Sequence, residues 1–410
     1  MVTRIRDQAV VETGVSRQQR AASSGRPHAD SAADASLSAG AEARKKRALT
    51  LAGGGPAVGI GLGVLKALGE VSNKVSFDVW SLSCVGAWLG CIYHVSPDRA
   101  EKYGFAERQM YGFFRDDDVY DKFPCPTIFV PDIPEWIAAS ARFMVDPRSY
   151  ANLVVPAEIL GGYQQLLDFY LRPSKWNYGE FCHLLLNACL APNPAARFLM
   201  SMIWKNELPG ISKLWYPHYD LLESLDMALL DHEDVPVLYH NAYNVDAQRL
   251  ELFSNKDGRY QKITAETLCA CSGLPYILSP VTINGATYVE GATIDTVGFE
   301  HLLQNHPNLD EVWVCRLLDT KQIRPHRNLV EALNNLVMLF AATTSTDDVK
   351  LFKFHLEKRN AEHNKKIALI EFPVDHHCSF EWNHSNLAES IEASHASAKR
   401  RIHAYLETGK

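Results

Sequence analysis

The sequence has no run of apolar residues that approaches the roughly 18 needed to cross a membrane. It also has no excess of basic residues, since there are 41 Lys and Arg against 48 Asp and Glu, and the net charge is -7. A protein that binds nucleic acid generally needs a basic face. These absences argue against a membrane-spanning protein and against a general nucleic-acid-binding protein. The 410 residues, 47% of them hydrophobic, are enough for one large or two ordinary domains of a soluble enzyme.

Paired short cysteine spacings are also absent. The nine cysteines are an odd number, which is typical of reduced thiols, and we therefore expect a cytoplasmic protein. His376 and His377 are adjacent, so in a strand they would point to opposite faces, and no second Cys or His pair follows at a zinc-finger spacing. We expect neither a metal site nor a cofactor.

Residues 1–46 lack the composition of a folded segment. They are rich in Ala, Ser, Arg and Gln, contain almost no aromatic residue, and have no apolar core of a secretory signal. We predict a disordered N-terminal arm. A weak likeness to a transit peptide, from its arginines and its few acids near the start, is the alternative.

A glycine run joins a predicted strand to a predicted helix. Residues 47–51 read as a short buried strand, Gly53, Gly54 and Gly55 follow, and an apolar helical stripe covers residues 60–68. Such a turn points several backbone N–H groups at one spot near the positive end of a helix dipole, which suits an anion. The anion is a phosphate or the oxyanion of acyl transfer, and the Gly-Lys-Ser/Thr ending of a phosphate loop is missing.

A second strand-to-helix turn follows 29 residues later. Residues 77–82 are strand-like and 86–90 begin a helix with small residues. A side chain on the sharp turn between them projects at the top of the sheet, and the next backbone N–H, that of Val85, completes an oxyanion hole. In the Gly-x-Ser-x-Gly register fixed by Gly86, the residue on the turn is Cys84.

The third segment runs from 270–275 to Tyr288-Val289-Glu290-Gly291-Ala292. The three segments, in this order, resemble the patatin-like phospholipase family, whose signature is a glycine-rich oxyanion loop, a serine elbow and an Asp-Gly-Gly or Asp-Gly-Ala motif. The resemblance covers about residues 47–297 and is weakest in the middle. It implies an α/β three-layer fold with a mostly parallel central sheet and a helical insertion.

The resemblance also assigns roles. It places Cys84 on the nucleophilic serine, Glu290 on the catalytic aspartate, and the run Gly53, Gly54 and Gly55 on the oxyanion loop. Gly86 then falls on the second elbow glycine, and Gly291 follows the carboxylate as in the family motif.

Besides Cys84 and Glu290, which replace a serine and an aspartate, three positions depart from the family pattern. Leu82 falls on the first elbow glycine, and Ala57 and Val58 fall on an arginine and a glycine, so the loop lacks a cation. A thiol depends less on a strong base than a hydroxyl does, so a cysteine tolerates a weakened dyad. A helix N-terminus lowers the thiol pKa and a carboxylate raises it, so the net direction stays open.

Two other residues compete for the catalytic roles. Ser83 is next to Cys84, but side chains alternate along a strand, so Ser83 should point away. Asp295, five residues after Glu290, follows the motif instead of occupying it, and we expect it to be solvated or to cap a turn.

The family-like α/β domain is expected over residues 47–410. Within it, residues 96–234 read as a helical insertion rich in aromatic residues, which we interpret as a cap with its own core in preference to a membrane-docking surface. Further strands are expected at 235–245, 250–253, 311–315 and 367–372, and helices at 329–360 and 387–406.

The favoured function is hydrolysis of a lipid ester or acyl thioester through an acyl-Cys84 intermediate, with Glu290 as the base. An acyltransferase that uses the same intermediate is one alternative. A catalytically inactive protein that binds lipid or a partner is the other, and Leu82, Ala57 and Val58 favour it. We expect an acyl ester or thioester substrate and no nucleic acid partner, with peripheral membrane contact left open. The sequence carries no signal for an oligomeric state.

Overall fold

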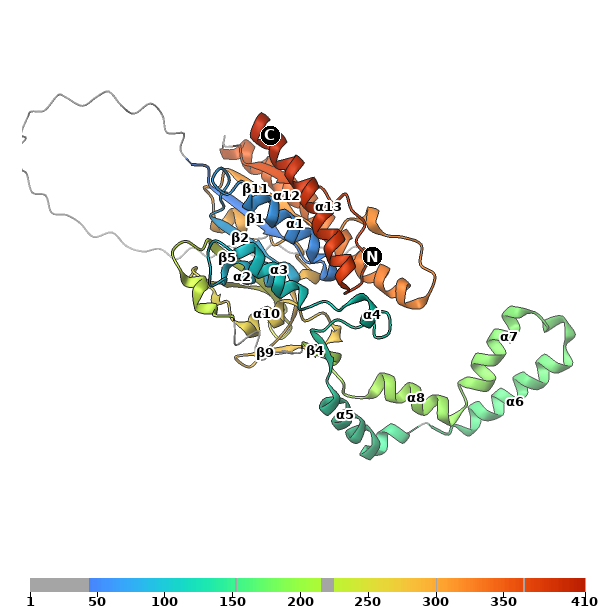
Figure 1. Cartoon of the computed structure of the whole chain (residues 1–410). Coiled ribbons are helices and arrows are strands. Elements are labelled where there is room, and N and C mark those ends of the chain that lie inside the picture. Colours follow the sequence, from blue (N-terminus) through green and yellow to red (C-terminus); the bar gives the residue numbers. More distant parts are fainter. Residues whose placement is uncertain (1–43, 152, 215–224, 300, 364–365, 410) are drawn as a thin grey trace, which may run out of the picture. The chain divides into compact units, whose positions relative to one another are not determined.

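The computed structural model describes residues 44–409, apart from 152, 215–224, 300 and 364–365 (Figure 1). Residues 1–43 of the predicted N-terminal arm therefore lie outside the described residues. No helix in the described part of the chain is both long and apolar enough to cross a membrane.

The α/β domain contains a central mixed β-sheet in which most of the strands are parallel, as the sequence predicts. Its parallel strands are ordered β12, β11, β1, β2 and β5, and β10, β9 and β6 add antiparallel pairs beyond them. All the strands expected from the sequence are present within two residues of their predicted ends. The bounds are β1 (Arg47–Leu51), β2 (Val79–Leu82), β5 (Val237–Asn244), β6 (Arg249–Ser254), β7 (Gln261–Lys262), β9 (Val281–Ile283), β10 (Ala286–Glu290), β11 (Glu311–Cys315) and β12 (Ala368–Glu371).

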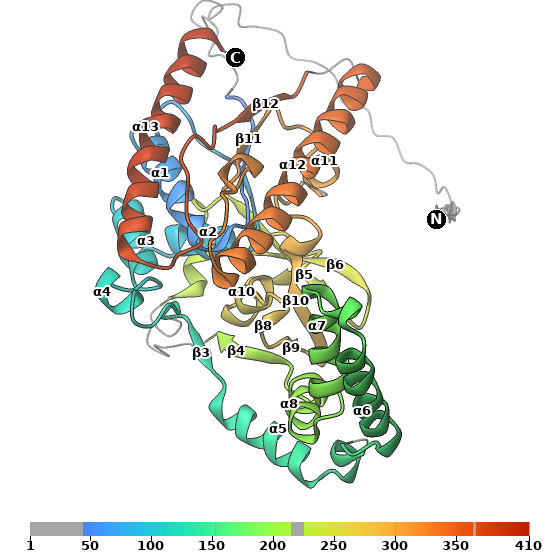
Figure 2. The same cartoon turned by 90° about the vertical axis from the view of Figure 1, so that its right-hand side faces the viewer.

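Helices cover both faces of this sheet, which is why β1, β2 and β11 are buried along their whole length. Leu49 and Trp80 point to one face, and Ala48 and Val79 point to the other. Figure 2 shows α1 and α13 on one side of the strands and α12 on the other, a three-layer arrangement. The covering helices are α1 (Val58–Gly69), α2 (Val85–His94), α10 (Ala265–Cys271), α11 (Leu302–Asn305), α12 (Leu329–His363) and α13 (His384–Thr408).

The inserted range 96–234 is mostly helical, as expected. The sequence analysis missed two short strands in it, β3 (Phe129–Pro131) and β4 (Gly210–Leu214), which join β8 (Tyr276–Leu278) in a separate three-stranded sheet. This sheet links the insertion to the segment that precedes Glu290. The helices of the insertion are α3 (Lys102–Tyr111), α4 (Asp117–Tyr120), α5 (Ile133–Val145), α6 (Pro156–Leu171), α7 (Tyr178–Leu184) and α8 (Pro194–Lys205).

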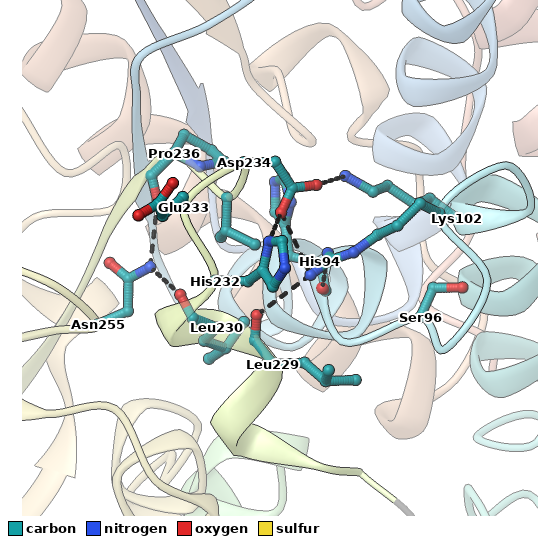
Figure 3. Close-up of polar contacts among 12 residues, drawn as sticks. His94, Ser96, Lys102, Leu229, Leu230, His232, Glu233, Asp234, Pro236 and Asn255 are labelled. Atoms are coloured by element: carbon teal, nitrogen blue, oxygen red, sulfur yellow. Dashed lines mark hydrogen bonds and ion pairs between the residues drawn. The ribbon is translucent and has the colours of Figure 1, made fainter.

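The two ends of the insertion are held together by a polar cluster (Figure 3). Arg99 donates to the backbone carbonyls of His94, at 2.9 Å, and Leu229, at 3.5 Å. Arg99 and Lys102 both form ion pairs with Asp234, at 3.4 and 3.8 Å. His232 also contacts the Asp234 carboxylate. The chain therefore leaves the α/β domain and returns to it at one place, next to the C-terminal end of α2.

Candidate active site

Cys84 lies on a strained turn between β2 and α2. β2 ends at Leu82, α2 begins at Val85, and Cys84 has a φ of 49° and a ψ of −126°. A positive φ is uncommon for a residue other than glycine, and strain of this kind gathers at functional sites. The Cys84 side chain is half-buried and lines a cavity. The local structure is therefore the elbow that the register of Gly86 predicts.

The Cys84 thiol and the Glu290 carboxylate line the same cavity, close enough for each to shift the pKa of the other. Glu290 is the last residue of β10 and is buried, so residues 206 positions apart meet at this point. Removal from water raises the pKa of Glu290 to about 7, although the nearby Cys84 thiol acts in the opposite direction. Desolvation and then the Glu290 charge raise the pKa of the Cys84 thiol well above its usual range. Burial and the Glu290 charge thus shift the thiol pKa in the same direction and favour the neutral thiol.

The loop around Glu290 is fixed by contacts with its backbone. The Glu290 N–H donates to the carbonyl of Gly273 at 3.0 Å, and the Thr293 hydroxyl donates to the Glu290 carbonyl at 2.8 Å. A Cβ atom on Gly291 would lie 2.6 Å from the side-chain oxygen of Asn241, so this position accepts only glycine without a shift. The glycine of the Glu-Gly-Ala motif therefore lets the loop lie directly against β5.

Asn241 connects the elbow to this loop. Its side-chain oxygen accepts from the Ser83 hydroxyl at 3.1 Å, and its side-chain nitrogen donates to the carbonyl of Asp295 at 2.9 Å. Asn241 is buried, so both hydrogen bonds are shielded from water. Sequence reasoning assigned Asn241 to a strand and missed this bridging position.

Neither competing residue faces the cavity. Ser83 is fully buried and bonded to Asn241, as expected from side-chain alternation. The Asp295 carboxylate accepts from the backbone N–H of Gly298 at 2.7 Å, so it caps a turn. The alternative that Asp295 is solvated is wrong, because its side chain is buried beneath the loop.

The first residue of the glycine run, Gly53, lies against Cys84. The backbone N–H of Gly53 is occupied, because it donates to the carbonyl of Thr296 at 3.1 Å. The N–H groups of Gly54 and Gly55 have no backbone acceptor among the described residues, and both glycines line the cavity. The N–H of Val85, at the start of α2, lies close enough to the Cys84 sulfur to lower its pKa slightly. Among the described residues, the amides of Gly54 and Gly55 therefore lack a backbone acceptor beside the cavity, and the Val85 amide lies near the thiol.

A second cysteine lies beside the first. The backbone N–H of Cys84 donates to the Cys271 sulfur at 3.0 Å, and burial, followed by the Glu290 charge, raises the pKa of Cys271 well above its usual range. Cys271 belongs to the third sequence segment, within residues 270–275, and had no predicted role. Nothing in its sequence position, 187 residues from Cys84, indicated this contact.

The cavity above Cys84 has a volume of about 350 Å³ and mainly apolar walls. Trp88 and Ser272 form part of the wall, joined by a hydrogen bond of 2.7 Å from the indole nitrogen to the hydroxyl. Glu290 is the one carboxylate that lines the cavity among the described residues, and no described Lys or Arg lines it. The inserted range supplies Phe113, Ile128 and Phe129, and α12 supplies Val337, Phe340, Ala341 and Thr344.

α12 is tied to the loop that follows Glu290. The Asp348 carboxylate accepts from the backbone N–H of Thr296 at 2.8 Å. Burial, and then the charge of Asp295, raise the pKa of Asp348 to about 7. The described residues contain no cluster of three or more His, Cys, Asp or Glu that could hold a metal ion.

A glycine turn, a strained elbow and a buried carboxylate around one apolar cavity place this chain among α/β proteins built on a strand–elbow–helix turn. A family model for patatin-like phospholipases matches residues 49–303. The chain belongs to the patatin-like phospholipase family. The match covers the elbow, the glycine run and the Glu290 motif.

The structure is similar to a crystal structure of VipD from Legionella pneumophila, with a TM-score of 0.36 and 13% sequence identity. The alignment covers 88% of this chain and 67% of that chain. No curated protein matches the sequence.

Proposed function

We propose that this chain is an acyl hydrolase that cleaves lipid esters or acyl thioesters through a covalent intermediate on Cys84. The observation that carries the proposal is that Cys84, on a strained elbow, and the buried Glu290 carboxylate line the same apolar cavity. Membership of the patatin-like phospholipase family supports hydrolysis of lipid esters. The thiol and the longer carboxylate are this chain's own departures from the family pair.

In the proposed acylation step, Glu290 takes the thiol proton as the sulfur attacks the substrate carbonyl carbon. The carbonyl electrons move to oxygen, and the amides of Gly54, Gly55 and Val85 stabilise that negative charge. When the carbonyl re-forms, the bond to the leaving alcohol or thiol breaks, and the leaving group takes the proton from Glu290. The products of this step are an acyl-Cys84 thioester and an ionised Glu290.

In the proposed deacylation step, ionised Glu290 takes a proton from water as the water attacks the thioester. Collapse of the second tetrahedral intermediate releases the carboxylic acid and returns the proton to the Cys84 sulfur.

Gly53 has a different role in this scheme from that of Gly54 and Gly55. Its N–H is occupied by Thr296, and a Cβ atom on it would lie 2.9 Å from the Cys84 Cβ, so it allows a close approach.

We propose that the inserted range 96–234 forms part of the acyl site. Phe113, Ile128 and Phe129 contribute apolar wall to the cavity, and the polar cluster at Asp234 returns the chain directly to β5. The apolar lining suits an acyl chain, and its described residues offer no cation for a phosphate group.

Intact mass spectrometry after exposure to short and long acyl esters and thioesters tests the proposal. The protein should gain the mass of one acyl group, and Cys84→Ala should gain none. Ser83→Ala is the matched control, because Ser83 is adjacent in sequence but points away from the cavity, and it should still be acylated.

Two results would overturn the proposal. Full acylation of Cys84→Ala would exclude Cys84 as the nucleophile, and a chain that never acylates would be a binding protein with this fold.

Addition of an amine or alcohol acceptor distinguishes hydrolysis from acyl transfer. Release of the acyl group only when the acceptor is present would make the chain an acyltransferase.

A further inference from the structure

The N-terminal half of α12 carries a row of exposed apolar side chains. Leu329, Leu333, Leu336 and Phe340 are spaced by four, three and four residues, so they share one face of the helix. Their exposed fractions are 88%, 50%, 48% and 68%. We call these four residues the α12 row. A surface helix normally turns polar side chains to water, so this face is unusual for a free surface.

The row is also free of charge over most of its length. No charged residue occurs between Glu331 and Asp347, a stretch of more than four helical turns. The opposite side of the same stretch packs inward, where Met338 and Ala342 are buried. The helix therefore has two apolar sides, and only one of them has a partner among the described residues.

The row leads into the cavity above Cys84. Phe340 belongs both to the row and to the cavity wall, and Val337, Ala341 and Thr344 continue the wall from the same helix. The hydrogen bond from Thr296 to Asp348 fixes α12 against the active-site loop. α12 can be followed in Figure 2, where it covers one face of the sheet. The exposed row is thus continuous with the proposed acyl site.

A basic rim precedes the row. Lys321, in the short helix η7 (Thr320–Gln322), and Arg324 are exposed, and neither forms an ion pair with a described carboxylate. The Arg324 guanidinium donates to the Lys321 carbonyl at 2.8 Å, and Asn335 donates to the Arg324 carbonyl at 2.6 Å. The second contact holds the rim against the first turns of α12.

We propose that the α12 row, together with Lys321 and Arg324, docks the mouth of the cavity onto an anionic lipid surface. An apolar helix face with basic residues at its edge is the pattern of a helix that lies in a membrane interface. The inference rests on the proposed function, because an acyl chain that leaves the lipid along this row enters the cavity without crossing water. In this proposal the α12 row makes the contact with the lipid surface, and Cys84 and Glu290 act on the acyl group that enters the cavity.

The helices of the insertion are a less suitable lipid-facing surface. They also expose apolar side chains, among them Ile203 and Trp204 on α8, but none of the described residues of α5 to α8 lines the cavity. Their charges are largely neutralised within the insertion, as in the pairs of Arg172 and Lys175 with Asp168 at 2.7 and 2.6 Å. Continuity with the cavity and the two basic side chains favour the α12 row.

Cosedimentation with phosphatidylcholine vesicles, with and without phosphatidylserine, tests the docking. Leu333→Gln/Leu336→Gln changes the row without touching the cavity lining and should weaken vesicle binding about tenfold or more. The matched control is Leu351→Gln/Phe354→Gln, on the same helix, where the exposed fractions are 59% and 62%. This control should bind as the parent does. Lys321→Gln/Arg324→Gln should remove most of the gain from phosphatidylserine, about tenfold.

Hydrolysis of a water-soluble short-chain thioester distinguishes the docking from the proposed function. All of these variants should keep parental turnover of that substrate, because none of the changed residues lines the cavity. Loss of vesicle binding by the row variant with no turnover in any protein would support the docking and reject the proposed function. Normal turnover with no vesicle binding by the parent would reject the docking alone.

Three further results would overturn the docking proposal. Equal losses in the row variant and its matched control would show nonspecific adsorption. Loss of binding in Ile203→Gln/Trp204→Gln, with the row variant unaffected, would place the lipid contact on the insertion. A dimer in light scattering that the row substitutions abolish, without an effect on vesicles, would make the row an interface between two copies.

Discussion

The side chain of Leu82 fills the space that Gly90 leaves open on α2. A Cβ atom on Gly90 would lie 2.7 and 2.8 Å from the two terminal methyl groups of Leu82, closer than real side chains approach. The resemblance described above places Leu82 on a glycine of the family elbow, and the Leu82 side chain is fully buried. The elbow therefore accommodates a bulky residue because the helix after it has a glycine at the point of contact. The departure at Leu82 is compatible with the strained turn at Cys84.

This packing predicts a coupled pair of substitutions. Gly90→Ala should destabilise the protein by about 1–3 kcal/mol through overpacking against Leu82. Leu82→Ala alone should cost about 2–5 kcal/mol by leaving a cavity. The double variant should lose less than the sum, because the new methyl group enters the vacated space. Urea unfolding measures the three free energies.

Gly69→Ala is the control for helix propensity, since a Cβ atom there meets nothing within 4 Å. It should be neutral or slightly stabilising. Additive losses in Leu82→Ala and Gly90→Ala would contradict the direct contact.

The second prediction concerns Glu290→Gln. Glu290 takes a proton in both proposed steps, but a thiol can also lose its proton to solvent, whereas the water that clears a thioester still needs a general base. The variant should therefore accumulate acyl-Cys84 and lose turnover by about two to four orders of magnitude. Intact mass and steady-state rates measure the two effects in one preparation. A variant that never acylates would make Glu290 as necessary for acylation as for deacylation, and one with normal turnover would leave it a structural residue.

The third prediction is a rise of activity with pH, with its midpoint near 7. The base must be ionised, and burial raises the pKa of Glu290 to about 7, so the active fraction grows as pH increases through that value. The Cys84 thiol ionises only well above its usual range, so it does not determine this rising limb of the pH profile. The rate of acylation by a soluble thioester, measured from pH 5 to about 9, should show it.

Cys84→Ser identifies the group behind that limb. Serine does not ionise in this range, so a limb that belongs to Glu290 should persist in the variant at a lower rate. The serine variant should also lose more activity on thioesters than on esters if the thiol has its own role. Disappearance of the limb in Cys84→Ser would assign it to the thiol.

Much of the fold and part of the site could be predicted because the signals are local. The glycine run, the elbow at Cys84 and the strand that ends at Glu290 each occupy a few consecutive residues, and the family resemblance places them together. The contact of Cys84 with Cys271 depends on how segments 187 residues apart meet, which no local pattern contains. The Leu82 departure looked unfavourable because Gly90, which relieves it, lies on the next element.

Two other features were missed for different physical reasons. β3 and β4 are short, β3 ends in a proline, and both lie in a helix-rich range, so strand periodicity is not visible there. The helical pattern over 329–360 was recognised, but its position over the cavity was not. The position of α12 follows from tertiary contacts alone, namely its residues in the cavity wall and the hydrogen bond between Thr296 and Asp348.

The last prediction concerns the stability of the contact between Asp348 and Thr296. The pKa of Asp348 is raised to about 7 from an ordinary value near 4, so between these values the folded state binds more protons than the unfolded chain. Its contribution to stability therefore falls as pH rises from about 4 to 7. An asparagine side chain at this position would still accept from the Thr296 N–H but would carry no charge beside Asp295.

The free energy of unfolding of Asp348→Asn should match that of the parent near pH 4 and exceed it by about 1–2 kcal/mol at pH 8. The difference is limited to this size because solvent screens part of the charge on a partly exposed side chain. Urea unfolding at several pH values measures the difference. Asp347→Asn is the control, because Asp347 is exposed and pairs with Lys350 at 3.0 Å, and it should show no such trend. A lower stability of Asp348→Asn at pH 8 would mean that the ionised carboxylate binds the Thr296 N–H strongly enough to outweigh its burial and its repulsion from Asp295.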